Sequence, residues 1–286
     1  MQVITDQILT KVITPRQPET HKGNYGRVLV IGGSKLYGGA GLLSASAALL
    51  TGAGLITLAS DAVNRSALHA RHPEIMFLDW TDLTTLTALI KQANVIVIGP
   101  GLGLDAHAQK LLQLTLTTVN AQQTLIIDGS ALTLLATGDF KIHCPAQLVL
   151  TPHQEEWHRL SGLKISAQNP IANQTALAAK FPKQTILVLK QHRTEIYSHQ
   201  DIFQNTSGTA AMATGGMGDT LTGIIAALIA QFKNVLPATL AAVYLHGLAG
   251  QLVGGTHYVA LHSALIKQIP ELMAQYSQRP STSELT

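Results

Sequence analysis

Residues 212–231, MATGGMGDTLTGIIAALIAQ, combine three glycines, an aspartate and an apolar segment of helical character. Gly215, Gly216 and Gly218 permit positive φ and let a ligand come close to the main chain. The first N–H groups of a helix lack intrahelical partners and carry partial positive charge, so this turn is suited to phosphate. Asp219 does not fit phosphate binding alone, because its carboxylate repels an anion. At this point Asp219 has two interpretations, a helix N-cap and a catalytic group.

Strand and helix patterns alternate along most of the chain. The expected strands are 27–33, 55–60, 94–101, 124–130, 147–152 and 185–190, and the expected helices between them are 39–52, 62–71, 82–92, 105–119, 153–161 and 168–181. Continuous apolar strands are typical of a parallel sheet buried on both faces, and the alternation predicts an α/β sandwich. Residues 193–206 resemble two antiparallel strands, and helices are expected at 219–232, 236–253 and 260–277. We expect one domain over residues 1–286.

Several of the expected strands end in glycine or polar residues, at 32–33 (the start of the glycine segment 32–41), 99–103, 128–130 and 151–154. Ligands of open parallel sheets bind outside the carboxyl ends of the strands, so these segments are expected to line one crevice. The first glycine segment fits a tight turn or a ligand loop equally well, whereas GPGLG at 99–103 favours ligand contact. Lys190 ends another strand, where it is either solvated or flanks a nucleotide.

The segment LTPHQEEWHRL, residues 150–160, predicts the start of a helix. Thr151 is the expected N-cap, and Gln154 completes a Thr-x-x-Gln capping box. His153 would then lie in the first helical turn and face the crevice, where it can donate a hydrogen bond to a ligand. Glu156 is expected on the helix surface.

The composition narrows the class of protein. Of the 286 residues 46% are hydrophobic and 12% charged, and the net charge is +3 without a Lys/Arg-rich segment, which argues against a nucleic-acid partner. Cys144 is the single cysteine and the histidines are scattered, so neither a disulfide nor a tight metal site of the chain itself is expected. Asp6 interrupts any signal-like apolar segment, and the uncharged residues 36–60 are broken by glycines, so we expect a cytoplasmic protein without a membrane span.

Together these motifs resemble the ADP/ATP-dependent NAD(P)H-hydrate dehydratases of the ribokinase-like superfamily. In chain order the motifs are Gly-Gly-x-x-x-x-Gly-Gly-Ala, Gly-Pro-Gly-Leu-Gly, Asp128-Gly-Ser-Ala, Thr-Pro-His153, Lys190-x-x-x-Thr194 and Ala-Thr-Gly-Gly-Met-Gly-Asp219-x-Leu-x-Gly. The resemblance covers about residues 20–255. Several ribokinase-like kinases share the Thr-Gly-Gly-x-Gly-Asp segment, but its combination with Thr-Pro-His and Gly-Pro-Gly-Leu-Gly is more specific. The resemblance implies a ribokinase-like three-layer α/β/α sandwich with a mainly parallel central sheet.

The activity that the resemblance implies is repair of hydrated NADH and NADPH. The terminal phosphate of ADP or ATP, with Mg²⁺, passes to the hydroxyl of the hydrated nicotinamide ring, and its departure restores the dihydropyridine. Many bacterial members use ADP and eukaryotic members use ATP. The resemblance also implies a homo-oligomer, a tetramer, whose partners are small-molecule substrates. Some relatives carry a second domain that interconverts the hydrate epimers. We expect none in this chain, and a functional pairing with a separate epimerase instead.

The resemblance implies specific roles for the motif residues. It assigns the hydrate to Ala40, Gly103, His153 and Asp219, the adenine nucleotide to Lys190, Gln191, His192, Arg193, Thr194 and Gly218, and an anion hole to the amides of Gly216, Met217 and Gly218. Asp219 then acts as the catalytic base that accepts the hydroxyl proton, with N-capping as an additional role. Two positions depart from the family: Gln191 stands where glycine is usual, and Thr209-Ala210 stands where Asn-Pro is frequent.

Two alternative functions are weighed against this one. A hydroxymethylpyrimidine or hydroxyethylthiazole kinase would share the Gly-x-Gly-Asp segment, but Thr-Pro-His and Gly-Pro-Gly-Leu-Gly argue against it. A nucleotide-binding sensor without turnover would gain little from Asp219, because a carboxylate beside phosphate weakens binding.

Overall fold

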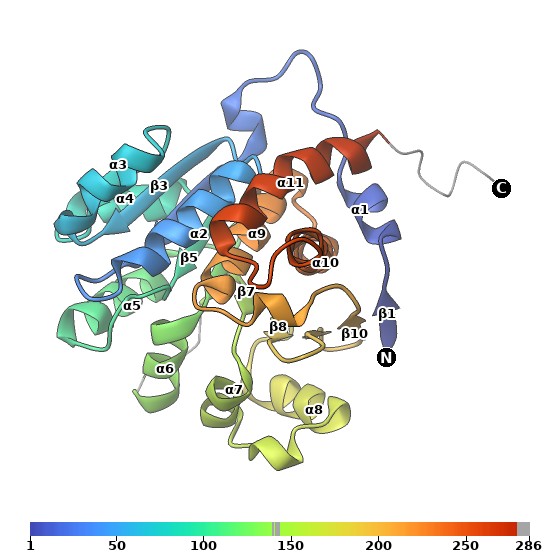
Figure 1. The fold of residues 1–286 in the computed structure, drawn as a ribbon. Coiled ribbons are helices and arrows are strands. Elements are labelled where there is room, and N and C mark those ends of the chain that lie inside the picture. The colour runs from blue at the N-terminus through green and yellow to red at the C-terminus, as the bar shows by residue number, and fades with distance from the viewer. Residues whose placement is uncertain (139, 141–143, 279–286) are drawn as a thin grey trace.

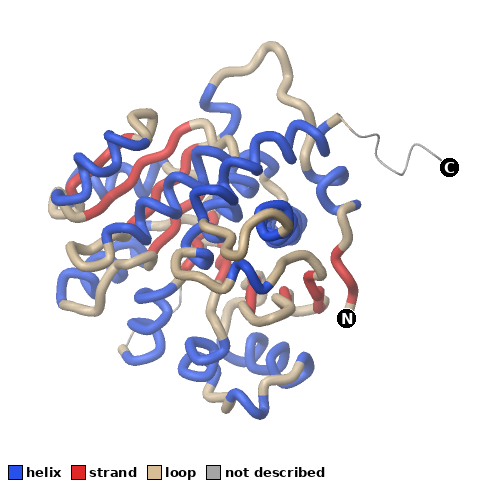
Figure 2. The backbone as a smooth tube through the Cα atoms, viewed as in Figure 1, coloured by secondary structure: helices blue, strands red, loops and turns tan. Residues whose placement is uncertain are grey.

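A ten-stranded sheet runs through the middle of the molecule, and helices cover both of its faces (Figure 1 and Figure 2). The computed structural model describes residues 1–138, 140 and 144–278. The strands are β1 (Gln2–Ile4), β2 (Arg27–Ile31), β3 (Leu55–Ser60), β4 (Met76–Asp79), β5 (Val95–Ile98), β6 (Thr124–Ile127), β7 (Gln147–Leu150), β8 (Ile186–Leu189), β9 (Glu195–Tyr197) and β10 (Ile202–Asn205). The helices are α1 (Gln7–Val12), α2 (Gly38–Leu50), α3 (Arg65–Arg71), α4 (Leu83–Gln92), α5 (Ala106–Thr118), α6 (Gly129–Thr137), α7 (Gln154–Ser161), α8 (Pro170–Lys180), α9 (Met217–Phe232), α10 (Val235–Gly254) and α11 (His262–Ser277).

The strands follow the spatial order β1-β10-β9-β8-β7-β6-β5-β2-β3-β4. All neighbours from β8 to β4 pair in parallel, β9 is antiparallel to both β8 and β10, and β1 pairs in parallel with β10. The expected three-layer sandwich with a mainly parallel sheet is therefore confirmed, as are the antiparallel strands within 193–206. The sequence analysis missed the two edge strands β1 and β4, and the helices α1 and α6.

The central strands bury both faces, and successive residues contribute to different cores. Val28 and Val30 of β2 belong to the core under α1, α2, α3 and α9 to α11, whereas Leu29 and Ile31 belong to the core under α4 to α8. Side chains of a strand alternate between the two faces of the sheet, so a strand covered on both sides needs apolar residues at every position. This is why the sequence shows continuous apolar segments.

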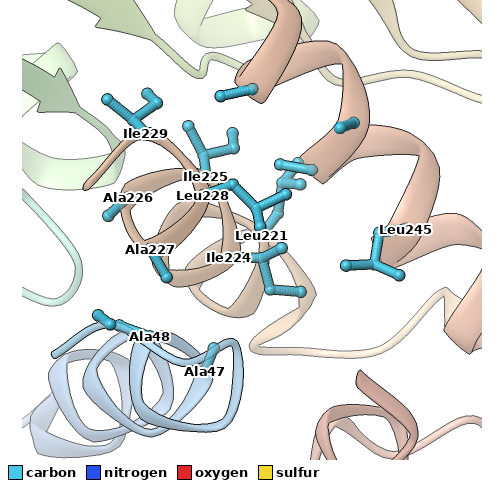
Figure 3. Packing of buried hydrophobic residues seen from close by; sticks show 14 of the residues in the cluster. Ala47, Ala48, Leu221, Ile224, Ile225, Ala226, Ala227, Leu228, Ile229 and Leu245 are labelled. Carbon is cyan, nitrogen blue, oxygen red and sulfur yellow. The ribbon is translucent and has the colours of Figure 1, made fainter. Parts of the chain in front are cut away.

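Helices α2 and α9 pack against each other through small residues, and Figure 3 shows Ala47 and Ala48 of α2 facing α9. A Cβ atom built on Gly223 would lie 2.1 Å from the carbonyl oxygen of Ser44 and 2.8 Å from the Cβ of Ala47. Beside this contact the hydroxyls of Ser44 and Thr222 are 3.2 Å apart and buried. Only glycine permits so close an approach, and this approach fixes the position of α9.

Helix α10 is the one helix of the described chain that is long and apolar enough to cross a membrane. Its most apolar window is 67% buried within the fold, where it packs against α1, α9 and α11. Burial on this scale is typical of the core helix of an α/β protein, and helix length with apolarity is weak evidence for a span.

We expect Gly223→Ala to lower the free energy of unfolding by about 1–3 kcal/mol, because the added methyl group must push α2 and α9 apart. Urea unfolding measures this change. Gly39→Ala is the matched control, since a Cβ at that helical position meets no atom within 4 Å. The control should be neutral or should raise stability by up to about 1 kcal/mol. Equal changes in the free energy of unfolding for the two substitutions would contradict the interpretation that α2 and α9 leave no space for a side chain at Gly223.

Candidate active site

Two glycine loops meet where the strand order reverses. From β2 the chain continues through β3 to β4 at one edge, and then from β5 towards the other, so β2 and β5 are neighbours at the switch point. The amide of Gly33 donates to the carbonyl of Pro100 at 2.8 Å, and the amide of Ser34 donates to that of Gly101 at 2.7 Å. The loops after β2 and β5 therefore form one wall at the carboxyl end of the sheet, where ligands of such folds bind.

Two of the residues predicted near the hydrate lie along this wall. The Cβ of Ala40, in the first turn of α2, is 3.0 Å from the place where a Cβ of Gly101 would lie. Gly103 has φ +90° and donates its amide to the hydroxyl of Ser130 at 3.2 Å. The small side chain at each position leaves the backbone of the loops accessible from the crevice.

The glycine turn before α9 has the form expected of an anion site. Gly216 is the N-cap with φ +90°, a conformation that favours glycine, and a Cβ there would require the Leu43 side chain to move, because its Cδ1 lies 2.3 Å away. The helix begins at Met217 rather than at residue 219, so the N-cap role for Asp219 was wrong. Asp219 is the third helical residue. The first-turn amides of Met217 and Gly218 have no acceptor within the helix.

The N-cap of α7 is His153, which corrects the predicted Thr151–Gln154 capping box. Its Nδ1 accepts from the amides of Glu155 and Glu156 at 3.1 and 3.2 Å, and the Glu156 carboxylate accepts from the amide of His153 at 2.8 Å. The hydroxyl of Thr151 donates instead to Asp128 at 2.8 Å. Because Nδ1 accepts, a neutral His153 carries its proton on Nε2. Nε2 lies 3.6 Å from Oε2 of Glu156, and the side chain is 52% exposed, so the Nε2 proton is accessible to a ligand.

The ammonium group of Lys190 pairs with one carboxylate at this edge of the sheet and is influenced by the charges of two others. Lys190 Nζ lies 2.7 Å from Oδ1 of Asp128, and 3.1 Å from the place where a Cβ of Gly218 would lie. Glu156 is 8% exposed, so its expected surface position was wrong. The charges of Asp128, Glu156 and Asp219 all act on Lys190, and although burial opposes them, they raise its pKa. The ammonium therefore stays charged beside the first turn of α9.

Burial raises the pKa of Asp219 from its ordinary 3.8 to about 6, and the neighbouring charges of Asp128 and Glu156 add to this while Lys190 opposes it. Burial also raises the pKa of Glu156, against the influence of Lys190. At neutral pH Asp219 is still mainly ionised, but it is a stronger base than an ordinary aspartate. A carboxylate with a pKa close to the working pH suits general base catalysis.

A cavity of about 520 Å³ opens beside this charged cluster. Of the residues predicted for the nucleotide, those that line it are Lys190, Gln191, His192, Thr194 and Gly218. His153, predicted for the hydrate, lines it too. Arg193 is exposed and lies outside the lining, as do Ala40 and Gly103. The cavity thus brings five of the six residues predicted for the nucleotide together with His153, and the wall with Ala40 and Gly103 lies apart from it.

Another cavity, of about 510 Å³, lies between residues 13–25 and α11. Its lining contains no Asp or Glu, and its one charged side chain, Arg16, stacks over Tyr25 and donates to the carbonyl of Gly52. Because this cavity lacks a base and a glycine turn at a helix start, we locate the candidate site at the first cavity.

The two departures from the family pattern are accommodated locally. Within the described chain Lys233 is the one non-glycine residue with positive φ, so Gln191 adopts an ordinary backbone conformation, and its side chain accepts from Gln154 at 3.3 Å. Thr209 caps the short 3-10 helix Ala210–Met212, accepting from the amide of Ala211 at 3.5 Å. Neither departure disturbs the turn before α9.

The described residues form no group of three or more His, Cys, Asp or Glu side chains placed to hold a metal ion. The carboxylate nearest the ammonium, Asp128, is already occupied by Lys190 and Thr151. Mg²⁺ commonly binds through one or two carboxylates together with substrate phosphates. A magnesium ion at this site would therefore take its ligands mainly from the phosphates of a bound nucleotide.

Sequence reasoning missed much of the far end of the cavity, which is lined by Asn205, Ser207, Gly208, Met212, Val243, His246 and Gly247 among others. His246 was the detectable signal, as a histidine within a nearly uniformly apolar helix. Burial lowers its pKa to about 4, and its Nε2 is buried without a hydrogen-bond partner in the described chain. The loop residues 205–213 carry no local pattern that distinguishes a cavity wall from an ordinary connection.

Comparison with known proteins agrees with this geometry. The family model described as NAD(P)H-hydrate dehydratase matches residues 28–271. An Enterococcus faecalis protein named ADP-dependent (S)-NAD(P)H-hydrate dehydratase is 46% identical over 278 residues, which are 97% of this chain and 94% of that protein.

Solved structures give the same result. A ribokinase-like superfamily protein from Enterococcus faecalis has a TM-score of 0.94 at 46% identity, over 98% of this chain and 97% of that one. The ADP/ATP-dependent NAD(P)H-hydrate dehydratase from Bacillus subtilis, co-crystallized with ATP/Mg²⁺, has a TM-score of 0.83 at 27% identity, over 95% and 97%. The fold of this chain is ribokinase-like, and the chain belongs to the NAD(P)H-hydrate dehydratase family.

Proposed function

We propose that this protein restores NADH and NADPH from their hydrates by nucleotide-dependent dehydration. The observation that carries the proposal is a partly buried carboxylate of raised pKa, Asp219, in the same helical turn as the open amides of Met217 and Gly218. A proton acceptor and a phosphate site in one turn suit phosphoryl transfer to a hydroxyl. The name of the Enterococcus faecalis relative supports hydrated NAD(P)H as the acceptor.

The proposed reaction has two steps. In the first step Asp219 takes the proton of the ring hydroxyl, while the hydroxyl oxygen attacks the terminal phosphorus of the nucleotide. The leaving group is AMP when the donor is ADP, and ADP when the donor is ATP. The amides of Gly216, Met217 and Gly218 stabilise the negative charge on the transferred group. In the second step the electron pair of the ring nitrogen expels phosphate from C6, and loss of a proton from C5 restores the dihydropyridine. Both protons finally go to solvent.

The nucleotide is proposed to occupy the 520 Å³ cavity, with its phosphates at Lys190 and Gly218 and its base towards Thr194 and α10. Gln191 and His192 line the same cavity, and Arg193 would act only from its exposed rim. The hydrate would lie on the wall formed by Ala40 and Gly103, with His153 between the two ligands. Mg²⁺ is proposed to arrive with the nucleotide, where it neutralises phosphate charge. We expect ADP to serve at least as well as ATP.

Three further features belong to the proposal. A homotetramer fits the low share of charged residues, 12%, and light scattering at micromolar concentration would refute it by giving a monomer mass.

A separate epimerase fits a base held at one position, which reaches one face of the hydrated ring. Equal turnover of both purified epimers would show that this protein needs no epimerase. A cytoplasmic location fits the presence there of pyridine nucleotides and ADP, and fractionation tests it.

The function is tested by incubating the protein with hydrated NADH, magnesium and either ADP or ATP. We expect the absorbance of the dihydronicotinamide to return and AMP to appear in the ADP reaction, at a rate at least equal to that with ATP. A reaction without nucleotide is the control. Phosphorylation of a thiazole or pyrimidine alcohol, with no effect on the hydrate, would contradict the proposal and favour a ribokinase-like kinase.

We expect Asp219→Asn to reduce turnover by roughly 10²–10⁴-fold, because an amide oxygen is a poor base. Since Gly216 caps the helix, the substitution leaves the cap intact. Removing a negative charge beside the phosphates should slightly strengthen ADP binding, which calorimetry measures. Turnover at the wild-type rate would refute the catalytic role of Asp219.

The same variant should change the dependence of stability on pH. The folded-state pKa of Asp219 is raised, so its ionisation costs the native state free energy above pH 6 and nothing below about 3.8. A pKa shift of one unit corresponds to about 1.4 kcal/mol, so ionisation of Asp219 lowers the free energy of unfolding by roughly 2–3 kcal/mol. Asp219→Asn should therefore be more stable than wild type at pH 8, and the difference should shrink as the pH falls to 4. A difference independent of pH in urea unfolding would contradict the raised pKa.

A third variant separates the two roles of His153. Asn is a good N-cap, so His153→Asn should preserve stability while it removes the Nε2 proton donor. We expect KM for the hydrate to rise by about 3- to 10-fold, the effect of one hydrogen bond, with little change in KM for ADP. His153→Ala is the comparison, and should in addition lose about 1 kcal/mol of stability with the cap. Equal rises for both ligands would show that His153 does not distinguish them.

A further inference from the structure

We infer that Asp128 is a positioning residue that holds the ammonium group of Lys190 over the first turn of α9, where the phosphoryl group is transferred. The inference rests on the proposed function and assigns a role to Asp128, for which the sequence motifs imply none. Asp128 follows β6, is 2% exposed, and accepts from Lys190 Nζ at 2.7 Å.

The backbone of Lys190 is fixed independently of its side chain. Its amide donates to the carbonyl of Pro152 at 2.8 Å, and it forms an isolated parallel bridge with His153. From this anchor the side chain reaches both Asp128 and Gly218, since a Cβ on Gly218 would lie 3.1 Å from Nζ. A single conformation thus satisfies the Asp128 pair and places a positive charge beside the amides proposed to hold the phosphoryl group.

Lysine has a flexible side chain, and Asp128 is one of several carboxylates that attract it. The groups whose charges act on Lys190 are Asp128, Glu156 and Asp219. If Lys190 paired directly with Asp219, the ammonium would stabilise the ionised carboxylate and make it a weaker base. The Asp128 pair prevents this, because it directs the charge of Lys190 to the phosphate and leaves Asp219 for the proton.

A purely structural role is the competing explanation. Oδ1 of Asp128 also accepts from the hydroxyl of Thr151, and this bond joins the ends of β6 and β7. Thr151 is fully buried, and valine has nearly its shape, so Thr151→Val removes this connection while it leaves the Lys190 pair. The two explanations therefore separate in a pair of variants.

The test compares wild type, Asp128→Asn, Asp128→Glu and Thr151→Val by steady-state kinetics with hydrated NADH and ADP between pH 5 and 9. The charges that act on Asp219 are Asp128, Lys190 and Glu156. For Asp128→Asn we expect kcat to fall at least about 10-fold, and the acid limb of kcat to move to lower pH by roughly 0.5 unit or more. Asp128→Glu should restore the acid limb, because the negative charge returns.

The controls separate the possible failures. Thr151→Val should keep the wild-type acid limb, whatever stability it loses in urea unfolding. Wild-type kcat and acid limb in Asp128→Asn, or the same profile in Thr151→Val and Asp128→Asn, would overturn the inference while the proposed function stands. If Asp128→Asn does not fold, Asp128→Glu provides the test. An acid limb of kcat in Asp128→Glu that differs from wild type would then overturn the inference. A wild-type protein that does not dehydrate the hydrate would overturn both.

Discussion

The close backbone contact between α2 and α9 determines where the catalytic groups lie. A Cβ on Gly223 would lie 2.1 Å from a backbone oxygen of α2, a distance that excludes a side chain. Gly216, seven residues earlier at the N-cap of α9, faces the Leu43 side chain of α2 and needs glycine for its φ of +90°. Helix α2 also carries Ala40 in its first turn and follows β2 at the switch point of the sheet. One helix therefore fixes both the turn that faces the phosphate and part of the wall that faces the proposed hydrate.

Burial, more than charge, controls the chemistry of Asp219. Desolvation is the largest cause of its raised pKa, and the carboxylates of Asp128 and Glu156 act in the same direction. Lys190 opposes them, but its closest contact is with Asp128. Interaction energy falls with distance, so an ammonium paired with Asp128 lowers the pKa of Asp219 less than one paired with Asp219 itself. The site thereby keeps the positive charge of Lys190 beside the helical turn that carries the base, and the two do not neutralise each other.

The sequence predicted those parts of the molecule that depend on local or repetitive patterns. Strands covered on both faces must be apolar throughout, so the central strands were recognised, and a glycine turn before a helix carries its own signature. The short edge strands β1 and β4 bury one face at most and lack that signature. The start of α7 was misread because Asp128, 23 residues away in sequence, takes the hydroxyl of Thr151, and His153 then caps the helix in its place.

Some residues of the site cannot be found from sequence patterns. Glu156 has the helical spacing of a surface residue, and only the packing of α7, which contacts α6 and α8, buries it beside His153. His246 lies in α10, and it meets the cavity because α10 packs against the short helix Ala210–Met212 after β10. Such residues follow from tertiary contacts between elements distant in sequence. The turn before α9 needs no such contact to be recognised, because its glycines, open amides and carboxylate are adjacent in the chain, as the phosphate and the hydroxyl must be in the reaction.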